Sequence, residues 1–208
     1  MNIKNAYNNW ASQYDTNKNK TRDLDARATR QVLNDYNFSD VIELGCGTGK
    51  NTQFLLKKAE KIIALDFSES MLAKAREKIK NPKVIFKQAD ISQPWDIPNE
   101  FADLVSINLV LEHINDMDAV FAQAYSKLKP GGIFFISELH PFKQYTGTKA
   151  RYPTEYGVQE LETYVHHLSE YFRAGQKQGF KAKRINEWFD DETEDSIIPR
   201  LISFVFRK

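Results

Sequence analysis

The sequence predicts an α/β fold in which a mostly parallel, doubly wound sheet carries helices on both faces. Five short segments are near-continuous runs of apolar residues, which is typical of strands buried on both sides. Segments with the apolar spacing of helices alternate with them, and such alternation is typical of parallel sheets with helical crossovers. The five strands are expected at residues 41–44, 61–66, 84–90, 101–108 and 133–138.

The first predicted strand runs into a turn that contains three glycines. Residues 41–50 read Val-Ile-Glu-Leu-Gly-Cys-Gly-Thr-Gly-Lys, and a helix is expected over 48–59. Glycine allows positive φ angles and a close approach of the backbone to a ligand, and the first N–H groups of a helix have no partner inside it. A strand, a glycine loop and a helix in this order indicate a binding site for a nucleotide-like ligand.

Acidic residues interrupt or end the predicted strands. Glu43 lies inside the apolar first strand, where a buried carboxylate is unfavourable unless it is hydrogen-bonded. We therefore expect it to order the loop or meet a polar ligand rather than face water. Asp66 ends the second strand, where a carboxylate in a doubly wound sheet can accept both hydroxyls of a ribose. Ser68 is expected to cap the helix at 68–79, and Asp90 ends the third strand.

The N-terminal region carries three aromatic residues at helical spacing. Tyr7, Trp10 and Tyr14 recur every three or four positions, which places them on one face of a predicted helix. Two interpretations stay open: the helix covers a surface groove, or its aromatic rings close over a bound ligand. A second helix is expected at 25–36.

The chain after the fifth strand contains an insert, one helix and two strands. Residues 139–156 show no regular period, and an insert at this end of a parallel sheet lies on its ligand-binding edge. Tyr145 and Tyr152 in this insert would either form a lid over a planar or apolar acceptor or be hydrogen-bonded surface tyrosines. A helix is expected at 169–178, with strands at 180–189 and 201–207 and a weaker strand pattern at 159–167.

Composition narrows the functional classes. The 208 residues are most simply one domain, and 29 basic against 28 acidic side chains give a net charge of +1 that requires neither nucleic acid nor an anionic membrane as partner. Cys46 is the single cysteine, which excludes an intramolecular disulfide and fits a reducing cytoplasm. No Cys/His spacing indicates a metal, and the acidic run at 190–195 is expected to be a solvated loop because calcium loops need staggered ligands and a glycine turn. We expect a soluble, cytoplasmic protein without membrane insertion.

Five ordered motifs connect these elements to a known family. The segments at 43–49, 64–72, 88–90, 101–105 and 128–133 resemble the class I S-adenosylmethionine-dependent methyltransferases. The pattern is most similar to their small-molecule branch, which includes the ubiquinone/menaquinone and biotin-pathway methyltransferases. Ala-Ser-Gln-Tyr-Asp at 11–15 is similar to a Tyr-Asp element that precedes the domain in that branch.

The resemblance implies a fold, a cofactor and a reaction. The fold would be a Rossmann-like seven-stranded sheet, mostly parallel with an antiparallel last strand. The whole chain, 1–208, would form one methyltransferase domain, with an N-terminal helical cap at 1–40, a cofactor-binding core at 41–138, a substrate-side insert at 139–167 and a C-terminal helix and strands at 168–208. The cofactor would be S-adenosylmethionine, with S-adenosylhomocysteine as product, and the partner a small-molecule acceptor rather than nucleic acid. The protein would be a monomer or homodimer.

The resemblance also assigns roles to individual residues. The glycine loop, through Gly45, Gly47 and the Cys46 backbone, would hold the methionine and ribose portion, with Glu43 ordering it. Asp66 would bind the ribose hydroxyls. The remaining cofactor contacts would be Phe67 and Met71 at the adenine, Asp90 and the Ile91 amide at its amino group, and Asn108 and Tyr14 at the amino-acid end. Acceptor contacts would come from Tyr7, Trp10, Tyr145 and Tyr152.

The resemblance leaves the acceptor open. A general base is needed if the acceptor is a hydroxyl or a protonated amine, and histidine titrates in the right range. His113 and His140 follow the fourth and fifth strands and are the catalytic candidates. The competing interpretation for each is a hydrogen-bonded structural histidine.

Three other functions fit the sequence less well. A nicotinamide-dependent oxidoreductase would carry Gly-x-Gly-x-x-Gly, but Lys50 occupies the sixth position and Gly49 comes one place early. A partner protein that binds the cofactor without transferring a methyl group would not need the full set of acids. Nucleic-acid amino-methyltransferases often carry Asn/Asp-Pro-Pro-aromatic after the fourth strand, where this chain has Asn108-Leu-Val-Leu.

Overall fold

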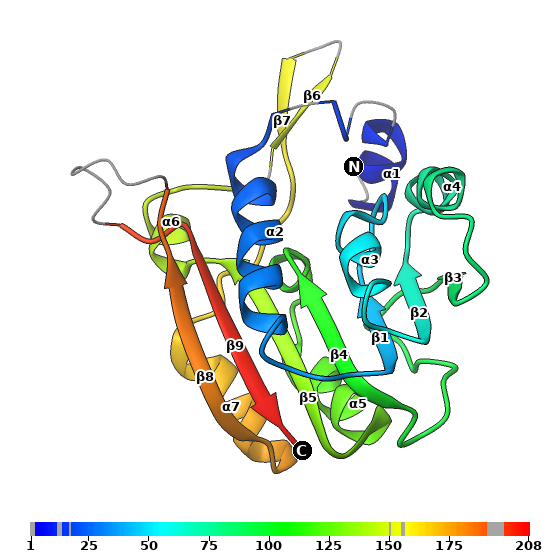
Figure 1. Ribbon diagram of the computed structural model, residues 1–208. Helices are drawn as coiled ribbons and strands as arrows, with labels where there is room; N and C mark the ends of the chain where they lie inside the picture. Colours follow the sequence, from blue (N-terminus) through cyan, green and yellow to red (C-terminus); the bar gives the residue numbers. More distant parts are fainter. Residues whose placement is uncertain (1–2, 12–13, 17, 150, 155–156, 191–197) are drawn as a thin grey trace.

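The structure is a computed structural model that describes residues 3–11, 14–16, 18–149, 151–154, 157–190 and 198–208, without the side chains of 4, 5, 9, 151–154, 158 and 159. A seven-stranded sheet with the order β3-β2-β1-β4-β5-β9-β8 runs through its centre (Figure 1). Its strands are β1 (Asp40–Leu44), β2 (Lys61–Asp66), β3 (Val84–Gln88), β4 (Ala102–Asn108), β5 (Leu128–Leu139), β8 (Lys181–Trp188) and β9 (Leu201–Arg207). The first five pair in parallel, and β9 is antiparallel to both β5 and β8. The predicted fold class is confirmed.

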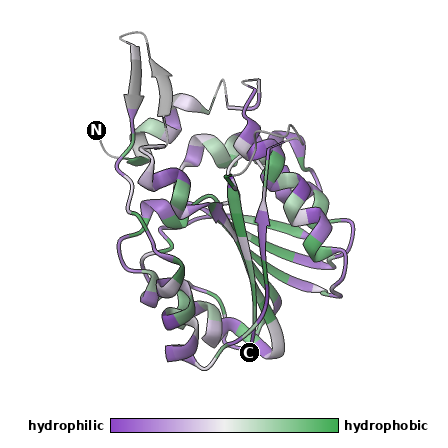
Figure 2. Ribbon diagram, turned by 90° about the vertical axis from the view of Figure 1, so that its left-hand side faces the viewer, coloured by the Kyte–Doolittle hydropathy of each residue, from purple (hydrophilic) through white to green (hydrophobic). Residues whose placement is uncertain are grey.

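Helices cover both faces of the sheet. The helices are α1 (Ile3–Trp10), α2 (Lys20–Leu33), α3 (Lys50–Leu55), α4 (Glu69–Lys78), α5 (Met117–Lys127), α6 (Pro141–Tyr145) and α7 (Leu168–Gln178), with a 3₁₀ turn η1 (Leu111–His113). Side chains of α5 and α7 share one buried cluster with Ile42, whereas α2, α3 and α4 share the other with Val41. Successive residues of β1 thus serve opposite faces, as the alternation of a strand requires. Figure 2 shows the apolar residues gathered along the strands and hydrophilic residues on the outer surfaces of the helices.

The parallel strands all end at one edge of the sheet, at the top of Figure 1. Helix α1 lies above this edge and contacts α4. The insert also lies on this side, with α6 and a separate two-stranded hairpin of β6 (Arg151–Thr154) and β7 (Gly157–Glu160). Residues distant in sequence therefore meet at the edge where a doubly wound sheet binds its ligand.

Several predicted boundaries are wrong in length. The helix expected at 48–59 is reduced to α3, because the amides of Lys57 and Lys58 bond only three residues back, to Phe54 and Leu55 at 3.1 and 3.0 Å. The third strand stops at Gln88, so its closing acid lies in the following loop. The strand pattern at 159–167 is realised only to the end of β7, because β7 has a single partner strand, β6, and no place in the main sheet.

The N-terminal aromatic residues meet, although they do not share one helix. Helix α1 ends at Trp10, and Tyr14 lies in the turn that follows. The rings still cluster, with centroids of Tyr7 and Trp10 6.0 Å apart and those of Trp10 and Tyr14 4.9 Å apart. The acidic run predicted to be a loop lies outside the described residues from position 191 onward. Among the residues described, no helix combines the length and apolarity that a membrane span requires.

Candidate active site

Two glycines of the loop after β1 are required by its geometry. Gly45 has a φ of +67°, and a Cβ there would lie 2.2 Å from Cγ2 of Val110. Gly47 has a φ of +53°, and a Cβ there would meet no protein atom within 4 Å. Both residues line a cavity at the carboxyl ends of the strands. The first glycine thus lets two loops pack together, and the second leaves space beside its backbone on the cavity side.

Glu43 connects β1 to the helix that follows the loop. Its side chain is buried, and its Oε2 accepts a hydrogen bond of 2.6 Å from Oγ1 of Thr52 in α3. Burial raises the pKa of Glu43 to about 8, so the carboxyl is largely protonated near neutral pH. Glu43 is not part of the cavity lining. Its hydrogen bond to Thr52 joins β1, which precedes the glycine loop, to α3, which follows it.

Asp66 ends β2 and faces the cavity. Its Oδ2 accepts from the backbone N–H of Gly47 at 2.8 Å, and its Oδ1 from that of Ser68 at 2.9 Å. Ser68 caps α4 by accepting from the N–H of Met71 at 3.2 Å. Burial raises the pKa of Asp66 to about 6, and these backbone bonds counteract the rise. One carboxylate therefore joins the glycine loop to the start of α4.

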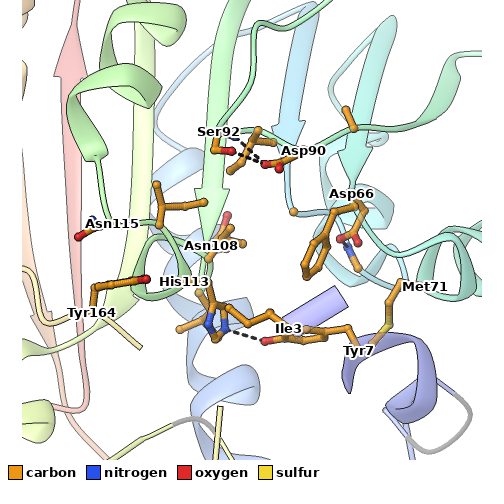
Figure 3. A pocket seen from close by; sticks show the side chains of 18 of the residues that line it. Ile3, Tyr7, Asp66, Met71, Asp90, Ser92, Asn108, His113, Asn115 and Tyr164 are labelled. Atoms are coloured by element: carbon orange, nitrogen blue, oxygen red, sulfur yellow. Dashed lines mark hydrogen bonds between the residues drawn. The ribbon is translucent and has the colours of Figure 1, made fainter. Parts of the chain in front are cut away.

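The cavity above these elements has a volume of about 500 Å³ (Figure 3). It brings together most of the residues expected to bind the cofactor: Tyr14, Gly45, Gly47, Asp66, Phe67, Met71, Asp90, Ile91 and Asn108. The side-chain N–H groups of Asn108 donate hydrogen bonds to Oδ1 of Asp25 and Oγ1 of Thr29, both at 2.8 Å. Its carbonyl oxygen is therefore the group that remains to face a ligand. Cys46, like Glu43, does not line the cavity.

Tyr7 and His113 form a hydrogen-bonded pair on the wall of the cavity (Figure 3). The Tyr7 hydroxyl lies 2.9 Å from Nε2 of His113, and Nδ1 of that ring lies 3.2 Å from the carbonyl oxygen of Glu162. A carbonyl can only accept, so Nδ1 carries the hydrogen, Nε2 is the acceptor, and Tyr7 donates. Burial lowers the pKa of His113 and raises that of Tyr7, which keeps both groups neutral.

The segment after α1 is anchored around the glycine loop. Oδ1 of Asp15 accepts from Oγ1 of Thr48 at 2.6 Å, and Oδ2 is ion-paired with Lys78 of α4. The Arg22 guanidinium stacks 4.0 Å from the centre of the Tyr14 ring. Tyr14 is thereby fixed at the rim of the cavity.

The structure does not bring every candidate to the cavity. His140 caps α6: its Nδ1 accepts from the N–H of Phe142 at 3.1 Å, and its Nε2 lies 3.2 Å from Oε1 of Glu187. Trp10 packs on Tyr14, and the exposed Tyr145 bonds to His167 at 2.7 Å. His140, Trp10 and Tyr145 therefore do not line the cavity. The side chain of Tyr152 is not among those that the structure describes.

The cavity also contains residues that sequence reasoning missed. They are Ile3, Ala89, Ser92, Leu109, Val110, Ile114, Asn115, Asp116, Ala119 and Tyr164. Most of them follow the ends of β3 and β4 directly, a position that could have identified them. No local sequence pattern indicates Tyr164, because its position depends on a hydrogen bond of 2.7 Å from its backbone N–H to the carbonyl oxygen of the distant Glu112. Within the described part of the chain, no group of three or more His, Cys, Asp or Glu side chains could hold a metal ion.

Comparison with known proteins relates this sequence to methyltransferases, through a family model and several relatives. A family model described as a methyltransferase domain matches residues 42–136. The trans-aconitate 2-methyltransferase of Acidovorax sp. (strain JS42) is 39% identical over 98 residues, which cover 46% of this chain and 36% of the relative. The malonyl-[acyl-carrier protein] O-methyltransferase of Priestia megaterium is 29% identical over 139 residues, covering 65% and 50%. The chain thus spans between a third and a half of the length of these curated relatives.

Solved structures match over almost the whole chain. A putative S-adenosylmethionine-dependent methyltransferase from Listeria monocytogenes has a TM-score of 0.77 at 24% identity and covers 90% of this chain and 99% of its own. The complex of DhpI with S-adenosylhomocysteine also has a TM-score of 0.77 at 24% identity, with 98% and 93% covered. This fold is therefore shared with a structure described as an S-adenosylmethionine-dependent methyltransferase and with a protein solved in complex with S-adenosylhomocysteine.

Replacing Glu43 by Gln should flatten the pH dependence of stability. The folded pKa of about 8 exceeds the ordinary value of 4.5, so the native protein holds a proton that the unfolded chain releases. The contribution of Glu43 to stability is therefore greatest below pH 4.5 and is lost as the pH rises toward 8, by at most about 1.4 kcal/mol per pH unit. Urea unfolding from pH 5 to 8 measures the slope. The exposed Glu60→Gln is the control, and an unchanged slope in Glu43→Gln would contradict the assignment.

Proposed function

We propose that this chain, as a member of the S-adenosylmethionine-dependent methyltransferases, transfers a methyl group to a small-molecule acceptor. The domain that relates it to this family lies at residues 42–136. The observation that carries the proposal is the position of Asp66. Its carboxylate is buried at the end of β2, oriented by two backbone N–H groups, and lines a cavity beside the glycine loop. A carboxylate held in this way retains acceptor capacity for a pair of ribose hydroxyls.

The residues around Asp66 fit the rest of the cofactor. Phe67 and Met71 offer apolar surface to an adenine ring, and Asp90 and Ile91 line the same cavity. The space beside Gly47 suits the ribose and methionine portion. Tyr14 and the carbonyl oxygen of Asn108 would face its amino-acid end. Glu43 and Cys46 would contribute through the loop backbone that they help to form.

The protein's part in the reaction is chiefly alignment. When bound, S-adenosylmethionine supplies a methyl group on a sulfonium centre that needs little further activation. Holding the acceptor in line with that methyl group can by itself contribute roughly 7–11 kcal/mol to catalysis. The aromatic rings of Tyr7 and Phe67, 5.7 Å apart between centroids, would exclude water from this region.

The Tyr7–His113 pair would remove the proton that the acceptor loses. Nε2 of the neutral His113 accepts from the Tyr7 hydroxyl, so a proton taken up at the Tyr7 oxygen can be passed on to His113. His140 has no role in this scheme, because both its ring nitrogens are engaged outside the cavity.

We extend the proposal to the protein as a whole. The chain would act as one methyltransferase domain, monomeric or homodimeric, in a reducing cytoplasm that suits its single cysteine. Its acceptor would be a small molecule and not a nucleic acid. The described lining of the cavity supports this, because it contains no Lys or Arg to neutralise phosphates.

Ligand-dependent stabilisation tests the proposed function directly. S-Adenosylmethionine and S-adenosylhomocysteine should each raise the melting temperature, whereas NAD should not. A ligand at a hundred times its dissociation constant stabilises a protein by about 2.7 kcal/mol. Differential scanning fluorimetry with the three ligands measures the shift. A shift with NAD alone, or with none of the three, would refute the proposal.

Replacing Asp66 by Ala should weaken S-adenosylmethionine binding tenfold or more, which corresponds to about 1.4 kcal/mol. The variant removes the ribose acceptor and releases the N–H groups of Gly47 and Ser68. Isothermal titration calorimetry gives the affinity, and urea unfolding checks that the variant is folded. Asp96→Ala, which removes a fully exposed carboxylate, is the control. Equal affinity in a folded Asp66→Ala protein would remove the basis of the ribose assignment.

Tyr7→Phe and His113→Gln should each lower kcat about 10²-fold, a typical contribution of general acid–base catalysis. The double variant should be no slower than the worse single one, because the two groups act as a unit. Turnover of the unaltered protein should fall as the pH drops through the lowered pKa of His113. Release of S-adenosylhomocysteine measures turnover, and Tyr125→Phe is the matched control. Additive losses, or losses confined to cofactor affinity, would rule out a shared proton transfer.

A further inference from the structure

A buried carboxylate on α2 is hydrogen-bonded to a residue that lines the cavity. Asp25 is 4% exposed and is not itself part of the cavity lining. Its Oδ1 accepts a hydrogen bond of 2.8 Å from the side-chain amide of Asn108, and its Oδ2 accepts one of 3.1 Å from that of Asn51 in α3. Asn108 ends β4 and lines the cavity (Figure 3). Asp25 therefore connects two helices to one group of the candidate site.

Asp25 determines which way the side-chain amide of Asn108 points. An amide has N–H donors on one side and an oxygen acceptor on the other, whereas a carboxylate can only accept. The N–H side of Asn108 must therefore face Asp25. Oγ1 of Thr29 accepts from the same amide nitrogen at 2.8 Å, but a hydroxyl can donate as well as accept and would fit either orientation. With both N–H groups bonded inside the protein, the oxygen of Asn108 is left for the cavity.

The hydrogen bonds at Asp25 favour its ionised form. Burial raises the pKa of Asp25, and hydrogen bonds that include those from Asn108 and Asn51 counteract the rise. The two amides that the carboxylate orients thus also stabilise the charge that lets it act only as an acceptor. The arrangement is complete within the protein and does not need a ligand to form.

An oxygen fixed in this way distinguishes between the two charged groups of a bound amino acid. The methionine portion of S-adenosylmethionine carries an ammonium group, which can only donate, and a carboxylate, which can only accept. The oxygen of Asn108 can accept from the ammonium group and offers nothing to the carboxylate. The reversed amide would have the opposite preference, because it would present its N–H groups to the cavity.

We propose that Asp25 is a positioning residue that holds Asn108 with its oxygen toward the cavity, where this oxygen accepts a hydrogen bond from the α-ammonium group of S-adenosylmethionine. The inference rests on the proposed methyl transfer and names the part of the cofactor that this side of the site recognises. Asp25 acts through Asn108, since it does not line the cavity. Fixing the ammonium group restrains the methionine chain, and with it the direction of the sulfonium methyl group.

Three ligands that share an adenosine portion test the recognition of the ammonium group. S-Adenosylhomocysteine carries the α-amino group, its deamino analogue lacks that group alone, and 5′-methylthioadenosine lacks the whole amino-acid portion. Isothermal titration calorimetry gives the affinity for each. The unaltered protein should bind the deamino analogue at least about tenfold more weakly than S-adenosylhomocysteine, because a hydrogen bond to a charged group is lost. Equal affinities for these two ligands would overturn the proposal.

The isosteric Asp25→Asn variant tests the positioning residue. An amide at position 25 can donate as well as accept, so the reversed orientation of Asn108 becomes possible. The preference for the amino group should fall below about threefold, while 5′-methylthioadenosine binds as before and shows that the variant is folded. Asp35→Asn changes an exposed aspartate just after the same helix and should keep the full preference. A full preference retained in Asp25→Asn would overturn the inference.

Exchanging the two groups separates orientation from general damage to the site. In the double variant Asp25→Asn/Asn108→Asp, the amide introduced at position 25 can donate to the carboxylate introduced at position 108, which again presents an oxygen to the cavity. The preference for the amino group should return to about tenfold or more. A double variant that binds 5′-methylthioadenosine without this preference would contradict the inference. Failure of the unaltered protein to bind any of the three ligands refutes the methyl-transfer function itself, so the two failures are distinguishable.

Discussion

The carboxylate of Asp66 occupies the centre of the candidate site, because each of its oxygens holds the backbone of a different element. One oxygen binds the glycine loop at Gly47, and the other binds Ser68 at the start of α4. These bonds fix the distance between the two elements that form the floor of the cavity. They also orient the carboxylate, so the group proposed to bind ribose is held before any ligand arrives. Such preorganisation reduces the entropy lost on binding.

The N-terminal segment depends on this framework for its own position. Ser68, which donates its hydroxyl to Oδ1 of Asn8 at 2.7 Å, connects α1 to α4. The adjacent Tyr7 bonds to His113 after β4, and Asp15 is tied to Thr48 in the glycine loop. A single segment thus contacts the proposed cofactor end and the proposed acceptor end of the cavity. The position of this segment therefore determines both contacts.

Sequence reasoning reached the parts of this arrangement that local patterns specify. The apolar strands, the glycine loop and Asp66 follow from the spacing of residues within single elements, and the structure has each of them near its predicted place. Whether Asp66 binds ribose stays a prediction. The pairing of Tyr7 with His113 spans 106 positions and depends on how α1 packs over the sheet, which no local pattern encodes. His140 illustrates the reverse: its place after a strand suggested a base, but the turn that follows uses it as the cap of α6.

The acidity of the cavity explains why a neutral histidine, and not a carboxylate, suits the role of base. Burial raises the pKa of Glu112, Glu138 and Asp66, and repulsion between buried negative charges adds to the rise for Glu138 and for Tyr7. Such carboxyls are partly protonated near neutral pH and cannot all accept a proton there. The imidazole of His113 responds oppositely to burial, which lowers its pKa and keeps its Nε2 lone pair available.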